Sequence, residues 1–134
     1  IDKMKRENVI ESLWKKGLYL SEKVNSLIIK YSLTDIVKLS GKPPWMILNF
    51  FDHENIEGAL IKTYYMVEML KNGVLISGSH NICHAHNDED MAHILKAYDQ
   101  TFINISRALD DKNIKDILTC PIIRPVFSVR DSKK

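Results

Sequence analysis

Apolar residues recur at helical spacing in three long segments of the chain. Across residues 2–31 they follow one another at steps of three, four and seven positions, which places them on one face of an α-helix. The same pattern predicts a second helix at residues 56–72, with Gly73 just past its end, where a left-handed backbone is favoured. A third helix is predicted at residues 87–110, because Asn87 can accept a hydrogen bond from a free first-turn amide.

Shorter runs of branched and aromatic residues predict strands between these helices. Residues 36–40 and 46–51 are typical of two strands, the apolar run 74–76 of a third, and residues 82–85 of a buried fourth. Two prolines within residues 41–45 remove two backbone donors, which predicts a stiff loop at the sheet edge. The chain is therefore predicted to have an α+β fold: a long N-terminal helix, a small, mostly antiparallel sheet of three to four short strands, and two further helices packed on one face.

One glycine and the C-terminal end complete the expected organisation. Gly17 lies near the apolar face of the first helix, where a glycine is either a tolerated flaw or allows another backbone to approach closely. Residues 114–118 are expected to form one more helical turn. Two prolines keep residues 120–129 extended, and residues 131–134 are expected to be a solvated tail.

The composition is that of one globular domain with its own core. The 134 residues are 45% hydrophobic and 27% charged, and the formal net charge of +2 gives no electrostatic reason to expect nucleic acid or a membrane as a partner. No apolar run approaches the ~20 residues of a spanning helix, and nowhere do these 134 residues contain a basic region followed by an apolar run and a small-residue cleavage site, the pattern of a secretory signal. Cys83 and Cys120 are therefore expected to be reduced thiols in a cytoplasmic protein. Because the chain starts at Ile1 without an initiator methionine, we expect it to be a piece of a longer protein.

Most of the side chains with reactive chemistry cluster in one segment. Three histidines and a cysteine lie between His80 and His86. These groups can bind zinc, but the paired C-x2-C spacing is absent, and in a strand Cys83 would point away from His84. A catalytic Cys83 with a histidine base is a second alternative, although no glycine-rich oxyanion loop accompanies it. The simplest interpretation is a small buried cysteine next to a capped turn.

Four separated motifs occur in an order and spacing known from one protein family. The motifs are Leu13-Trp14-Lys15-Lys16-Gly17, Leu39-Ser40-Gly41-Lys42-Pro43-Pro44, Met69-Leu70-Lys71-Asn72-Gly73 and Ala85-His86-Asn87-Asp88-Glu89-Asp90. Together they resemble the C-terminal small domain of class III, fold type I, pyridoxal-phosphate (PLP) aminotransferases, in particular those similar to glutamate-1-semialdehyde aminomutase. The resemblance extends over about residues 7–130, so residues 1–130 are expected to be this domain and residues 131–134 the tail.

The resemblance implies an enzyme whose active site lies between a large cofactor-binding domain and this small domain, usually across a homodimer. In that family the lysine that holds PLP belongs to the large domain, and no lysine of this chain sits in the corresponding motif. We therefore expect PLP in the full-length enzyme and none bound by this fragment alone, which should be inactive and should hold no catalytic residue. The expected partners are its own large domain, a second copy of the enzyme and a small-molecule substrate.

The resemblance also indicates which residues form the substrate side of the site. The glutamate that the aminomutases carry near the reaction centre corresponds to Gly78 here. The polar turn that follows, Ser79-His80-Asn81, resembles instead the aminotransferases that act on other amino compounds, including sugar-derived ones. Ser79, His80 and Asn81, with Trp45, are therefore the candidates for one wall of the active site.

The role of His86 has two alternatives after the resemblance is considered. His86 corresponds to a position just before the helix cap, where an imidazole that bonds the turn is favoured over a catalytic one.

The full-length protein is predicted to transfer amino groups to a small carbonyl substrate. The alternatives are an aminomutase of the glutamate-1-semialdehyde type and a non-catalytic interaction or regulatory domain.

Overall fold

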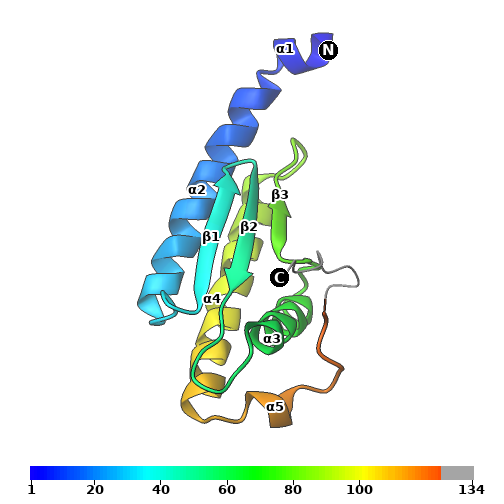
Figure 1. Ribbon diagram of the computed structural model, residues 1–134. Coiled ribbons are helices and arrows are strands. Elements are labelled where there is room, and N and C mark those ends of the chain that lie inside the picture. The colour runs from blue at the N-terminus through cyan, green and yellow to red at the C-terminus, as the bar shows by residue number, and fades with distance from the viewer. Residues whose placement is uncertain (125–134) are drawn as a thin grey trace, which may run out of the picture.

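The computed structural model describes residues 1–124, in which helices pack on one face of a small sheet (Figure 1). The helices are α1 (Asp2–Arg6), α2 (Val9–Lys30), α3 (Gly58–Lys71), α4 (Asp88–Asp110) and α5 (Ile114–Ile117). The strands are β1 (Val37–Lys42), β2 (Trp45–Phe50) and β3 (Ser79–Asn81), and they pair in that order as an antiparallel sheet. The predicted α+β fold is therefore confirmed. The predicted tail at residues 131–134, and the extended segment beyond residue 124, lie outside the described residues.

The first predicted helix is in fact two helices. Asn8 separates α1 from α2 with a φ of 46°, a left-handed conformation that asparagine tolerates better than most residues. None of the residues of α1 is buried, so no core contact holds it in line with α2. The prediction of one helix over residues 2–31 was wrong at this point. The spacing of apolar residues gives no sign that a single residue adopts a left-handed backbone conformation.

Gly17 allows α2 to touch the turn of the β1–β2 hairpin. A Cβ atom at this position would lie 2.0 Å from the carbonyl oxygen of Pro43. Pro43 and Pro44 alone form the turn, which is shorter than the predicted loop at residues 41–45, since Trp45 already belongs to β2. Of the two alternatives for Gly17, close backbone approach is therefore the correct one.

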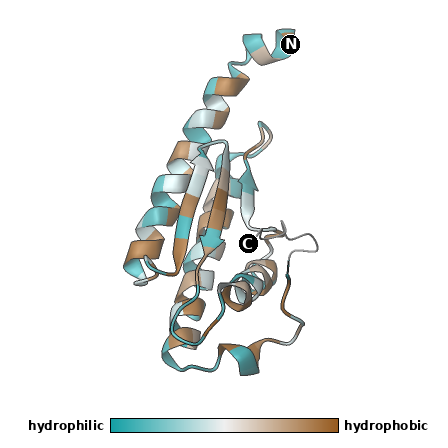
Figure 2. Ribbon diagram, viewed as in Figure 1, coloured by the Kyte–Doolittle hydropathy of each residue, from teal (hydrophilic) through white to brown (hydrophobic). Residues whose placement is uncertain are grey.

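The core lies between the sheet and the three long helices α2, α3 and α4. Hydrophobic and hydrophilic bands alternate along α2, as the amphipathic pattern predicts (Figure 2). The largest side chains that are fully buried include Leu20, Leu48, Tyr65, Tyr98 and Phe102. None of the helices in residues 1–124 is both long and apolar enough to cross a membrane.

The start of α4 agrees with the prediction. The side chain of Asn87 accepts a hydrogen bond from the amide of Asp90, and the Asp90 carboxylate accepts one from the amide of Asn87, both at 2.9 Å. This reciprocal pair satisfies two backbone donors that the helix itself cannot satisfy. The acidic first turn also offsets the positive end of the helix dipole.

The chain between α3 and α4 departs from the prediction. Gly73 ends α3 with a φ of 79°, as expected, but residues 74–76 form no strand. The third strand is β3, at the residues that were predicted to be a turn, and residues 82–85 form a loop with a turn instead of a buried strand. Cys83, expected to be buried, is exposed and free.

We expect Gly17→Ala to destabilise the protein. Alanine is ordinarily ~1 kcal/mol more favourable than glycine inside a helix. Here the added methyl group must displace the Pro43 carbonyl, so we predict a loss of about 1–3 kcal/mol in the free energy of unfolding, measured by urea titration. Asn25→Ala, at an exposed position of the same helix, is the control and should change stability by less than ~0.5 kcal/mol. A Gly17→Ala protein as stable as the parent would show that the close approach is absent.

Candidate functional site

Three of the four candidate residues lie together on the face of the sheet that the helices leave uncovered. Asn81 is the direct neighbour of Trp45 in the β2–β3 register, and Ser79 is the neighbour of Ile47. Because side chains alternate along a strand, these four point to the same side. Trp45 is 62% exposed and Ile47 is 39% exposed. We call this surface the open sheet face; its side chains are Ser40, Lys42, Trp45, Ile47, Ser79 and Asn81.

His80 points to the opposite side of the sheet, into the core. It is only 6% exposed and pairs with the buried Met46 across the β2–β3 register. Its Nε2 atom shares a hydrogen bond with the hydroxyl of Tyr98, and the two ring centroids lie 5.3 Å apart. The structure thus separates His80 from the other three candidates, because a strand at residues 79–81 turns its middle residue inward.

The hydroxyl of Tyr98 links the sheet to two helices. Besides its bond to His80, it lies 2.8 Å from the hydroxyl of Tyr65, so β3, α4 and α3 meet at one buried atom. A tyrosine hydroxyl can donate one hydrogen bond and accept another, which satisfies both neighbours. The helical pattern places Tyr98 on the buried side of the third helix, but the sequence gives no sign of its partner His80, 18 residues away.

Burial keeps this chain of three side chains uncharged. It lowers the pKa of His80 from 6.5 to about 4, and the nearby His86 contributes to the same shift. Burial also raises the pKa of Tyr65 and of Tyr98 above the ordinary value of 10.0. At neutral pH His80 is therefore a neutral hydrogen-bonding group that fixes β3 in place. It does not act as a charge facing a ligand.

The loop after β3 is held by side chains that the sequence did not single out. Lys16 donates hydrogen bonds from Nζ to the backbone oxygens of His84 and His86, at 3.2 and 2.5 Å. His84 Nε2 lies 3.2 Å from a carboxylate oxygen of Glu7. His86 Nδ1 accepts a bond from the amide of Cys83 at 3.4 Å, which confirms that its imidazole bonds the turn. The three histidines of this segment therefore make three separate structural contacts, and Cys83 contributes its backbone amide to one of them.

No described part of the chain gathers the ligands of a metal ion. Among residues 1–124, no three side chains of histidine, cysteine, aspartate or glutamate lie close enough to share one. A cavity of about 310 Å³ beside β3 does contain both His80 and His86, with Ser77, Ser79 and Asn81 also in its wall. His80 is buried and already bonded to Tyr98 there, whereas the ring of His86 is only half-buried.

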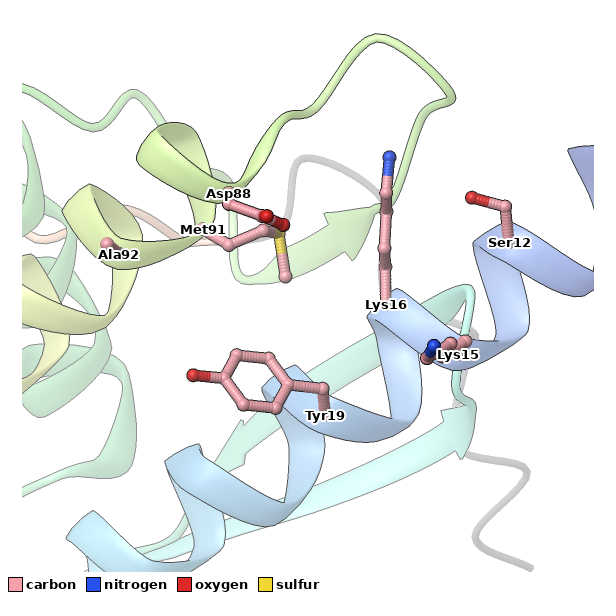
Figure 3. A pocket seen from close by; sticks show the side chains of 7 residues that line it. All are labelled: Ser12, Lys15, Lys16, Tyr19, Asp88, Met91 and Ala92. Carbon is pink, nitrogen blue, oxygen red and sulfur yellow. The ribbon is translucent and has the colours of Figure 1, made fainter.

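A larger groove of about 440 Å³ lies between α2 and the start of α4 (Figure 3). Figure 3 shows Lys16 pointing past it toward the loop before α4, while Tyr19 faces Met91 and Asp88 across the gap. None of the candidate residues from the sequence lines this groove. Among its lining residues, Lys16 makes hydrogen bonds that the structure describes, and these go to the neighbouring loop at His84 and His86.

The comparisons with known proteins include an informative structural match. No protein family matches the sequence, and no curated protein matches it either. The fold is similar to part of the FumI protein of Sphingopyxis sp. MTA144, solved in its PLP internal aldimine form, with a TM-score of 0.66 and 22% sequence identity. The similarity covers 81% of this chain and 26% of that chain, so the present chain spans about a quarter of its length. The chain therefore has the fold of one part of a PLP-binding protein.

The low pKa of His80 predicts that the protein loses stability in acid. Between pH 6.5 and about 4 the unfolded chain binds a proton at His80 that the folded chain does not bind. The free energy of unfolding should therefore fall as the pH falls through this window, by about 3 kcal/mol from this residue. His80→Gln keeps a hydrogen-bonding group and removes the titration, so the difference in stability between neutral pH and pH 4 should shrink by that amount in urea titrations.

His93→Gln is the matched control for this prediction. His93 is exposed on α4, outside the buried hydrogen-bonded group of His80, Tyr98 and Tyr65, so its replacement should not reproduce the effect of His80→Gln. Equal pH dependence in the His80→Gln protein and the parent would contradict the assignment of His80 as the buried neutral imidazole.

Proposed function

We propose that the chain is the C-terminal small domain of a PLP-dependent aminotransferase of class III, and that the open sheet face forms one wall of its active site. The observation that carries the proposal is the similarity of fold to the FumI protein over 81% of this chain. The four sequence motifs support the finer assignment to class III. The remaining part of the enzyme, including the lysine that holds PLP, would lie outside this chain, as would a second copy that completes a homodimer.

The open sheet face has the composition of a substrate-side wall. The indole of Trp45 offers a flat apolar surface, and the Asn81 side chain beside it offers a donor and an acceptor. Within residues 1–124, the side chains of Ser79 and Asn81 make no hydrogen bond to another group, so both are available to a ligand. When bound in the whole enzyme, PLP would supply the electron-withdrawing chemistry, while these residues orient the substrate.

His80 supports this wall from behind. Its bond to Tyr98 fixes the middle of β3, and the residues on either side of it are Ser79 and Asn81. A buried imidazole that is hydrogen-bonded to a neighbouring helix holds a short edge strand more firmly than an exposed one would. We therefore assign His80 a positioning role and Ser79, Asn81 and Trp45 the contact with substrate.

The backbone at Gly78 favours an aminotransferase over an aminomutase. The resemblance places the aminomutase glutamate at this position, but Gly78 has a φ of 96°, which L side chains rarely adopt. A Cβ atom here would also lie 2.9 Å from Cε of Lys62. The local fold is thus built for a glycine, and a carboxylate at this point would require a different backbone. The acceptor we propose is a small carbonyl compound, with sugar-derived compounds as the class that the Ser79-His80-Asn81 resemblance suggests.

The proposal predicts that the full-length protein retains PLP after borohydride treatment. The reduction makes the link between the cofactor and its lysine irreversible, so a reduced chromophore should remain after dialysis under denaturing conditions. Asn81→Ala should keep this chromophore, because Asn81 does not hold the cofactor. It should lower turnover with amines by about tenfold, the effect of one lost hydrogen bond to a charged group.

Asn25→Ala, on the outer surface of α2, is the matched control and should behave as the parent in both measurements. A full-length protein without a chromophore would refute the PLP assignment. An Asn81→Ala protein with the chromophore and unchanged turnover would refute the role of the open sheet face.

A further inference from the structure

Within residues 1–124, one lysine is half-buried and has no partner. Among the lysines of residues 1–124, only Lys16 and Lys62 are half-buried, and the others are exposed. The ammonium of Lys16 is satisfied by two backbone oxygens. Lys62, on α3, makes neither a hydrogen bond nor an ion pair with any described residue.

On the same helix, another lysine lies beside a carboxylate and forms an ion pair with it. Lys71, nine positions along α3, lies 2.7 Å from a carboxylate oxygen of Glu68, which is almost fully buried. By contrast, no carboxylate of residues 1–124 lies within ion-pair distance of the Lys62 ammonium. An ammonium group carries three hydrogen-bond donors, and those of Lys62 are taken by no residue of the described part of the chain.

The amino group of Lys62 lies against the first residue before β3. Measured from the Cβ position that Gly78 would have, Lys62 Cε is 2.9 Å away and Nζ is 3.3 Å away. The missing side chain of Gly78 therefore makes the room that the lysine occupies. Gly78 also accepts a backbone hydrogen bond from Leu48 at 2.8 Å, which fixes this point to β2.

Two hydroxyl groups flank this point in the chain. Ser77 and Ser79 stand on either side of Gly78, and neither hydroxyl takes part in a hydrogen bond with the described residues. Ser79 is also the first residue of β3 and belongs to the open sheet face. In the part of the chain that the structure describes, an ammonium and two hydroxyls without partners thus occur at the start of the strand that carries the proposed substrate contacts.

We infer that Lys62 forms the cationic part of an anion-binding subsite at the start of β3, with Ser77 and Ser79 beside it. The subsite takes the carboxylate or phosphate group of the small-molecule substrate, because a compact ammonium with nearby hydroxyl donors suits either anion. This inference rests on the proposed function, since it adds the charge class of the substrate to the same site.

The test follows the Lys62 amine directly by NMR of the full-length protein. Lysine amines are dimethylated with ¹³C, which keeps their charge, and the Lys62 signal is identified by its loss in Lys62→Arg. Inorganic phosphate and succinate are then titrated at constant ionic strength. The Lys62 signal should shift saturably in the millimolar range with at least one of them, and the anion that binds tighter identifies the group as phosphate or carboxylate.

The Lys71 signal is the internal control, because that amine is already paired with Glu68. A Lys62 signal that moves no more than the Lys71 signal, with both anions, would overturn the subsite. The chromophore of the same sample reports on the proposed function separately. A protein that retains PLP while Lys62 fails to respond loses the subsite alone, and a protein that never binds PLP loses the proposed function whatever Lys62 does.

Discussion

The structure depends most on the buried hydroxyl of Tyr98. It is the one described atom at which β3, α3 and α4 meet, through its bonds to His80 and Tyr65. These groups are fully buried or nearly so, and a buried polar group without a partner would cost about 1–3 kcal/mol. The bond therefore decides which way β3 faces. With His80 turned inward, Ser79 and Asn81 must point outward, and the outward side is the surface on which the proposed function rests.

The same bond explains where the sequence misleads. An apolar run such as residues 74–76 looks like a strand, while Ser79-His80-Asn81 looks like a turn, because hydrophobic patterns count histidine as polar. In the folded chain His80 occupies the core position of the strand, since Tyr98 satisfies its ring nitrogen. A pattern within a single segment cannot reveal this, because the partner lies on α4.

Features that depend on neighbouring residues were predicted well, and those that depend on distant contacts were not. The three long helical patterns, the cap at Asn87, the left-handed Gly73 and the antiparallel sheet all follow from local spacing. The sequence leaves two alternatives for Gly17, because the Pro43 carbonyl that lies against it comes from a distant segment of the chain. The contacts of Lys16 and Lys62 join segments far apart in the chain, so spacing carried no signal for either.

Under the proposed function, the uncovered face of the sheet would contact the rest of a larger enzyme, and the position of the cofactor tests this proposal most directly. If this domain is one wall of a PLP site, the full-length protein binds PLP through a lysine outside these 134 residues. After borohydride reduction and proteolysis, peptide mass mapping should locate the phosphopyridoxyl group on a lysine encoded before Ile1. A phosphopyridoxyl group on any lysine within residues 1–134, or on none in the whole protein, would contradict the assignment of the chain as the small domain of a PLP enzyme.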